Sequence, residues 1–125
     1  FLPGLQGPDS KMSASKPDSA IFTTDTPKDA RRKIMRSFSG GAPSLEEHRK
    51  HGGNPDVDTA YQYLSNVFEE DDERIREVHD AYKSGSMTTG EIKELLAKKV
   101  ESFLKRHQAR REAAKKQLDK FLLKD

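Results

Sequence analysis

The stretch Thr88 to Leu122, TTGEIKELLAKKVESFLKRHQARREAAKKQLDKFL, decides the fold of this chain. After Gly90 it contains neither Gly nor Pro, and its apolar residues recur at the three- and four-residue spacing of one helix face. They are Ile92, Leu95, Leu96, Val100, Phe103, Leu104, Ala114, Leu118, Phe121 and Leu122. We expect one long helix, straight or kinked, which at about 1.5 Å per residue reaches roughly 50 Å. A domain of this size does not need a helix of that length.

Capping residues and glycines divide the chain upstream of this stretch into shorter helices. The first is expected from Pro27, behind the N-cap Thr26, to the glycine pair at Gly40. Its apolar face carries Ala30, Ile34 and Phe38, and its other face carries Lys28, Arg31, Arg32, Lys33 and Arg36. This basic face either contacts phosphates or is simply solvated.

The second helix is expected between the N-cap Ser44 and Gly52. It carries His48 and His51, which have no third ligand at helical spacing. We therefore expect no metal site and interpret both histidines as surface or hydrogen-bonding residues.

Two more helices are expected before the long one. The apolar face of the first, which Asp56 caps, consists of Val57, Ala60, Tyr61, Leu64, Val67 and Phe68. Tyr61 is expected in the core, whereas Tyr63 lies on another face and should have a freer hydroxyl. The acidic run Glu69 to Glu73 leads into the next helix, because carboxylates favour a helix N-terminus. Its buried stripe is Ile75, Val78 and Tyr82, and Gly85 ends it.

Composition limits the protein to one domain and part of another. Its 125 residues are 32% hydrophobic and 35% charged, so the core must be thin. The absence of Cys excludes disulfide frameworks, Cys-based zinc sites and thiol nucleophiles. No apolar run approaches the roughly 20 residues that span a bilayer, so we expect no membrane partner.

The net charge of +2 averages over three blocks of opposite sign. Residues 11–36 hold seven basic and three acidic side chains, and residues 69–80 hold seven acidic and two basic ones. Residues 98–120 hold nine basic and three acidic ones. Two basic blocks favour a polyanionic partner, and a set of solvated helix faces is the alternative.

A polar stretch near the N-terminus, Lys11-Met12-Ser13-Ala14-Ser15, lies between Pro8 and Pro17 and is therefore a loop. Its ammonium, its two hydroxyls and the amides of an unpaired backbone suit a polyphosphate such as that of ATP. A surface turn rich in Lys and Ser is the other interpretation.

This loop resembles the KMSKS signature of class I aminoacyl-tRNA synthetases, in the KMSAS form of the eukaryotic and archaeal tryptophanyl branch. Nearly the whole chain resembles the tryptophanyl-tRNA synthetase family, segment by segment and in the same order. The segments are Phe1 to Gly7, Pro17 to Asp25, Phe38 to Gly41, Glu46 to Arg49, Gly52 to Asn54, Asp56 to Asp58 and Thr89 to Lys93. The tyrosyl family has a similar loop, but the segments between Phe38 and Asp58 favour the tryptophanyl branch.

The resemblance implies a mainly α fold in two parts. Residues 1–25 would be the C-terminal end of a Rossmann-type catalytic domain, and residues 26–125 a helical anticodon-binding domain. Because the chain begins at Phe1 and lacks the second class I signature, we expect a C-terminal fragment that is inactive by itself. The tryptophan pocket and most of the ATP site would lie upstream, in an enzyme that is a cytoplasmic homodimer.

The implied reaction activates tryptophan with ATP, with Mg²⁺ accompanying the pyrophosphate, and then transfers it to the tRNA for tryptophan. Lys11 would stabilise charge on the departing pyrophosphate, while Ser13 and Ser15 with the loop amides would hold the phosphates. Ala14 stands where many class I enzymes carry a second Lys, so Lys16 is considered as the source of the missing charge.

The tRNA contacts are expected around the start of the last helix. Free amides and the positive dipole end at Thr89-Gly90 favour an anion or a base edge, and Lys93 stands in the first turn. The loops after Gly41 and Gly53 would supply neighbouring walls. The other tRNA candidates are Glu46, Arg49, Arg110 and Arg111. A free-standing helical RNA-binding or scaffold module without catalytic activity is the alternative function.

Overall fold

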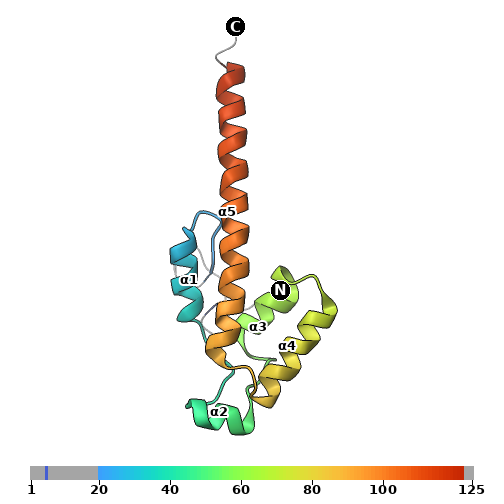
Figure 1. Cartoon of the computed structure of the whole chain (residues 1–125). Helices are drawn as coiled ribbons and strands as arrows, with labels where there is room; N and C mark the ends of the chain where they lie inside the picture. Colours follow the sequence, from blue (N-terminus) through green and yellow to red (C-terminus); the bar gives the residue numbers. More distant parts are fainter. Residues whose placement is uncertain (1–4, 6–19, 123–125) are drawn as a thin grey trace.

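The computed structural model describes Leu5 and residues 20–122, and of Phe121 the backbone alone. The loop Lys11 to Ser15 and Lys16 lie outside the described residues. The elements in chain order are α1 (Pro27–Met35), α2 (Leu45–His51), α3 (Thr59–Tyr63), the π-helical turn η2 (Leu64–Phe68), α4 (Asp72–Ser84) and α5 (Thr89–Leu122). All regular structure in the described ranges is thus helical, which confirms the mainly α fold class (Figure 1).

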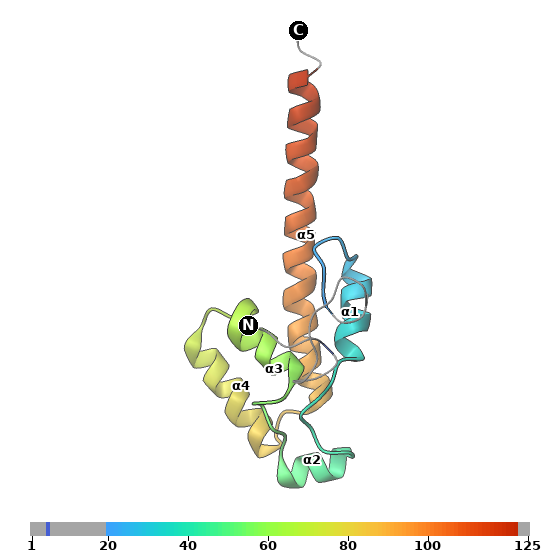
Figure 2. The same ribbon diagram turned by 180° about the vertical axis from the view of Figure 1, so that it is seen from behind.

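The helix α5 is the axis on which the other elements pack. In both Figure 1 and Figure 2, α1 lies on one side of it and α3 with α4 on the other, while α2 sits beyond its start. The contacts agree, since α5 touches α1, α3, η2 and α4, and α2 packs against α4. The buried core consists of Leu5, Ala30, Ile34, Ala60, Tyr61, Tyr63, Leu64, Val78, Tyr82, Ile92, Leu96, Ala97, Val100 and Leu104. It is thin, as the composition predicts, and it follows the first half of α5.

The second half of α5 projects beyond this core (Figure 1). Its last anchor to the body is Gln108, whose amide Nε2 donates to the carbonyl oxygen of Asp25 at 2.9 Å. Every described side chain from residue 109 onward is exposed, including Leu118 at 56% and Leu122 at 67%. The expectation of one long helix is confirmed. The described apolar side chains of its second half stay exposed, because the body is shorter than the helix.

Ion pairs fasten α1 to the buried half of α5. The Arg31 guanidinium contacts both Glu94 and Glu101, with its Nε 2.8 Å from one Glu101 oxygen and its Nη2 3.1 Å from one Glu94 oxygen. Lys33 is only 5% exposed, and its ammonium donates to the carboxylate of Asp25 at 2.8 Å and the carbonyl of Ala20 at 3.1 Å. These two members of the basic face therefore hold the fold together, which the sequence did not indicate.

The end of α1 differs from the expectation. The helix stops at Met35, and the Ser37 hydroxyl donates to the Ile34 carbonyl at 2.6 Å, so the chain turns away before Phe38 can join the buried stripe. Phe38 is 41% exposed, and its amide donates to the Leu5 carbonyl at 2.8 Å.

The third helix begins and ends differently from the prediction. Its N-cap is Asp58 and not Asp56, because the Asp58 carboxylate accepts the Tyr61 amide at 2.9 Å. The π-helical turn η2 then closes with the Glu69 amide on the Leu64 carbonyl at 2.9 Å. This wider turn shifts the helical register, so Val67, expected in the core, is 53% exposed. Tyr63, expected to be freer, is buried, and this burial raises its pKa to about 12.

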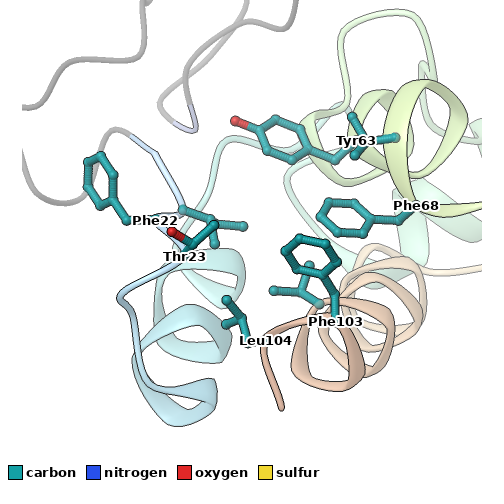
Figure 3. A pocket seen from close by; sticks show the side chains of 9 residues that line it. Phe22, Thr23, Tyr63, Phe68, Phe103 and Leu104 are labelled. Carbon is teal, nitrogen blue, oxygen red and sulfur yellow. The ribbon is translucent and has the colours of Figure 1, made fainter. Parts of the chain in front are cut away.

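One apolar cavity interrupts the packing between the segment after Ala20, η2 and α5. Its volume is about 170 Å³, and Figure 3 shows the side chains that surround it. Phe68 and Phe103 meet edge to face across part of its wall, with ring centroids 5.8 Å apart. The lining residues are Ile21, Phe22, Thr23, Tyr63, Val67, Phe68, Val100, Phe103 and Leu104. A cavity with so few polar groups is a packing defect and not a site for a charged ligand.

Candidate nucleic-acid interface

The start of α5 and the loop before α2 together form a pocket of about 250 Å³. It is lined by Ala42, Pro43, Ser44, Leu45, His48, Thr88, Thr89 and Gly90. This arrangement confirms that the loop after Gly41 forms a wall beside the start of the helix. The loop after Gly53 does not line the pocket, because Gly53 instead packs against the ring of Tyr82.

A capping box starts α5 at this pocket. The Thr88 hydroxyl oxygen accepts the Glu91 amide at 3.1 Å, and one Glu91 carboxylate oxygen accepts the Thr88 amide and hydroxyl, each at 3.0 Å. These bonds to the carboxylate lower the pKa of Glu91. The amides of Thr89 and Gly90 have no acceptor among the described residues, so they remain available to a ligand.

A buried hydrogen-bond network fixes the loop to the helix start. Asp58, with no exposed surface, accepts the Gly40 amide and the Tyr82 hydroxyl, both at 2.9 Å. The Tyr82 hydroxyl is also 3.1 Å from the Thr89 hydroxyl, which lies 3.2 Å from the hydroxyl of Ser39. Burial raises the pKa of Tyr82 to about 12, so its hydroxyl stays protonated and donates at neutral pH. The network therefore ties the chain just before the pocket loop to Thr89, which lines the pocket.

His48 forms one wall and leaves one nitrogen unused. It is 3% exposed, its ring packs on Tyr82 with centroids 5.1 Å apart, and its Nε2 lies 2.7 Å from the Met87 carbonyl oxygen. Because a carbonyl only accepts, Nε2 must donate, and Nδ1 of the neutral ring is an acceptor. Nδ1 has no partner in the described structure and lies beneath Gly41, where a Cβ would come within 3.1 Å of it. The hydrogen-bonding interpretation of His48 is confirmed.

Lys93 does not line this pocket. It is 8% exposed, and its ammonium donates to the carbonyls of Met35 at 3.0 Å and Ser37 at 2.8 Å. Burial lowers its pKa. Lys93 thus closes the C-terminal end of α1 and holds the chain that leads to the pocket loop.

Two tRNA candidates lie on α2. Arg49 bonds to neighbouring groups of the described structure, and Glu46, in the first turn of α2, makes no bond to a described side chain. Arg49 Nη1 donates to the Ser86 carbonyl at 2.6 Å, and its Nη2 lies 3.8 Å from the Glu91 carboxylate. Arg49 therefore ties α2 to the loop that precedes α5. Glu46 is exposed, next to the exposed apolar side chain of Leu45 on the pocket rim.

The remaining candidates, Arg110 and Arg111, lie on the projecting half of α5 and are both exposed. Successive helix residues point about 100° apart, so the two arginines serve different faces. Arg111 lines a cleft with the segment before α1, and Arg110 does not.

The described residues contain no group of three His, Asp or Glu side chains that could hold a metal ion. Among these residues, no helix combines the length and apolar character needed to cross a membrane.

A family model described as tRNA synthetases class I (W and Y) matches residues 1–105. The chain belongs to this family. Tryptophan–tRNA ligase of Saccharolobus solfataricus is 53% identical over 116 residues, which are 92% of this chain and 30% of that ligase. The cytoplasmic tryptophan–tRNA ligase of Schizosaccharomyces pombe is 54% identical over 112 residues, 89% of this chain and 28% of that ligase. The chain thus spans about 30% of the length of these relatives.

Solved structures give the same assignment to the synthetase family. Tryptophanyl-tRNA synthetase from Giardia lamblia superimposes with a TM-score of 0.85 and 46% identity, covering 90% of this chain and 28% of that one. Tyrosyl-tRNA synthetase from Aeropyrum pernix, at 21% identity and a TM-score of 0.67, covers 86% of this chain and 32% of that one and shares the fold alone. The difference in identity places the chain with the tryptophanyl members, of archaeal and eukaryotic type.

Proposed function

We propose that this chain is part of a tryptophan–tRNA ligase, which activates tryptophan with ATP and transfers it to its tRNA. The support is its identity of 50 to 53% to archaeal ligases of that name over nearly all of the chain. In this proposal residues 1–25 complete a Rossmann-type catalytic domain and residues 26–125 form the anticodon-binding domain. The complete ligase is a cytoplasmic homodimer.

The catalytic contribution proposed for this chain is electrostatic. Lys11 stabilises the negative charge that develops on the pyrophosphate, which Mg²⁺ accompanies, and Ser13 and Ser15 with the amides of the loop hold the phosphates. Lys16 supplies part of the charge that Ala14 lacks.

The tRNA-binding contribution rests on one observation, the pocket in which the loop before α2 meets the free amides at the start of a 34-residue helix. Thr89 and Gly90 offer hydrogen-bond donors, His48 contributes its ring to the wall, and exposed Leu45 offers an apolar surface for the face of a base. Lys93 and Arg49 act by holding the backbone around this pocket.

A chimeric enzyme tests the proposal. The matching segment of the Saccharolobus ligase is replaced by this chain, and we expect the chimera to charge tRNA with tryptophan. In it, Lys11→Ala should slow adenylate formation by roughly 10- to 1000-fold, the loss expected for one transition-state charge contact. Tryptophan binding is the control for folding. A chimera that binds tryptophan but forms no adenylate would contradict the proposal.

Three further measurements separate the roles within this chain. Lys16→Ala should also slow adenylate formation, and its effect should be less than additive with that of Lys11→Ala.

Lys93→Ala should raise the KM for tRNA, with the rate of adenylate formation as the internal reference. The unmodified chain alone should show no tryptophan-dependent pyrophosphate exchange, and measurable exchange would overturn the assignment of the amino-acid pocket to another part of the ligase.

A helical RNA-binding module without catalysis is the second candidate function. It is favoured by the closed core of the described helices, in which Tyr82, Ile92 and Leu96 have no exposed surface. Tight tRNA binding by this chain, combined with a chimera that never activates tryptophan, would select it.

A further inference from the structure

A second, larger cleft lies where α5 leaves the body. Its volume is about 570 Å³, and its walls are α5 on one side and the segment before α1 on the other. The lining residues are Thr24, Thr26, Gln108, Arg111, Glu112 and Lys115. Figure 1 shows the blue segment that precedes α1 beside α5 at the point where the helix begins to project. The anticodon proposal does not use this cleft.

The helix wall of the cleft carries two cations with no partner. Arg111 and Lys115 are four residues apart, which places them on the same face of α5. Neither makes an ion pair or hydrogen bond to any described residue, and both are exposed. Glu112 is the one acidic residue in the lining, so the cleft keeps a net positive charge.

The opposite wall offers hydroxyl groups and a helix start. The Thr26 oxygen accepts the Asp29 amide at 3.1 Å as the N-cap of α1, which leaves its hydroxyl proton free to donate. Thr24 adds a second hydroxyl, and the positive end of the α1 dipole lies beside them. Gln108 joins the two walls through its bond to the Asp25 carbonyl at 2.9 Å, so the segment before α1 is held beside α5 without a ligand.

We propose that this cleft binds a backbone phosphate of the tRNA, held by Arg111 and Lys115 from one side and by the hydroxyls of Thr24 and Thr26 from the other. This inference rests on the proposed function and adds to it a site that reads no base. A guanidinium presents a planar set of donors that matches two phosphate oxygens, and an ammonium four residues away supplies a second charge. The net charge of the lining, two cations against one carboxylate, matches the single charge of a phosphodiester.

Neighbouring cations provide a matched control for this site. Lys116 and Lys120 are also four residues apart on the projecting half of α5 and are exposed, but they do not line the cleft. Removing either pair lowers the charge of the projecting half of α5 by two. Only a difference between the two pairs reports on the cleft, because general attraction to a polyanion is the same for both.

The experiment measures the binding of this chain to a transcript of a tryptophan-specific tRNA at several salt concentrations. The double variant Arg111→Gln with Lys115→Gln should bind about tenfold or more weakly and should lose roughly one unit of the slope of log K against log salt. The control pair, Lys116→Gln with Lys120→Gln, should bind less than about threefold more weakly. Circular dichroism verifies that both variants keep α5 helical.

Equal weakening by the two pairs would overturn the proposal, because it would mean diffuse attraction to the whole helix. Inorganic phosphate separates the two sources of the anion: a saturable phosphate complex that the Arg111 and Lys115 double variant loses, while its affinity for the transcript stays at the wild-type value, would assign the cleft to a free anion and would also overturn the proposal. The chimeric ligase distinguishes this failure from failure of the proposed function, since charging with tryptophan can be lost or kept independently of the difference between the pairs.

Discussion

The two halves of α5 share one helix and one apolar period but differ in everything around them. From Thr89 to Gln108 the helix buries Ile92, Leu96, Val100 and Leu104 and is fastened by side-chain bonds to α1 and to the segment before it. From Ala109 to Leu122 every described side chain is exposed. An amphipathic pattern therefore identifies a helix face without saying whether the same chain covers it.

The largest expected effect is the loss of a core leucine from the first half. Leu96→Ala should lower the free energy of unfolding by about 2 to 5 kcal/mol, because it removes a fully buried side chain and leaves a cavity. Leu118→Ala, the matched change in the projecting half, should stay within about 0.5 kcal/mol. Urea unfolding of both variants measures the difference. A loss of several kcal/mol at Leu118 would mean that another surface covers it in solution.

A smaller loss of unfolding free energy is expected from a change at Thr88, the N-cap of α5 beside the pocket. Thr88→Ala removes the N-cap of α5 and should cost about 0.5 to 2 kcal/mol in the same urea measurement. Thr88→Ser keeps the hydroxyl oxygen that accepts the Glu91 amide and should recover most of the loss. If both variants were equally unstable, the methyl group and not the cap would be the source of the stability.

Alkaline pH should weaken the body through its buried tyrosines, whereas residues 109–122 contain no Tyr. Burial raises the pKa of Tyr63 from 10.0 to about 12, so the folded state retains a proton that the unfolded state has lost. This contribution is complete below pH 10 and declines as the pH rises toward 12. Between these values the unfolding free energy of Tyr63→Phe should fall less steeply than that of the wild type. Parallel slopes in urea unfolding across this range would contradict the burial of Tyr63.

The smallest global effect is expected from a glycine in the projecting half. Ala113→Gly weakens the helix locally by about 1 kcal/mol but should leave the urea midpoint of the body almost unchanged. Amide hydrogens after residue 109 should then exchange about fivefold faster, while those near Val100 keep their rates. Equally faster exchange along the entire helix, including near Val100, would show that the halves unfold together.

Periodicity and capping residues were sufficient to predict that the helices exist, because each helix depends on residues close together in the chain. The caps Thr26 and Ser44 and the glycine stop Gly85 were all placed correctly for this reason. The register of α3 was placed two residues early, since Asp56 and Asp58 both fit the cap rule and only the buried bonds to Gly40 and Tyr82 select Asp58.

The candidate site was predicted only in outline. The pairing of the loop after Gly41 with the start of α5 was expected from the resemblance to the family, and the pocket confirms it. Lys93 was expected at the tRNA surface because it stands in the first turn of α5, close to the free amides of Thr89 and Gly90. Its burial depends on carbonyls 56 and 58 residues away in sequence, which no local pattern contains. The KMSAS loop, Lys11 to Ser15, lies outside the described residues, and its role stays a prediction.

The clamp of Arg31 on Glu94 and Glu101 has a consequence for sliding between helices. The two carboxylates are seven residues apart, which is two helical turns, so both face α1 at once. Moving α1 along α5 by one residue would shift it about 1.5 Å and would call for a rotation of about 100°, and neither carboxylate would then meet the guanidinium. The position of α1 along α5 is therefore fixed by this ion pair. A shift of one residue in either direction would bring no other pair of carboxylates seven residues apart to Arg31.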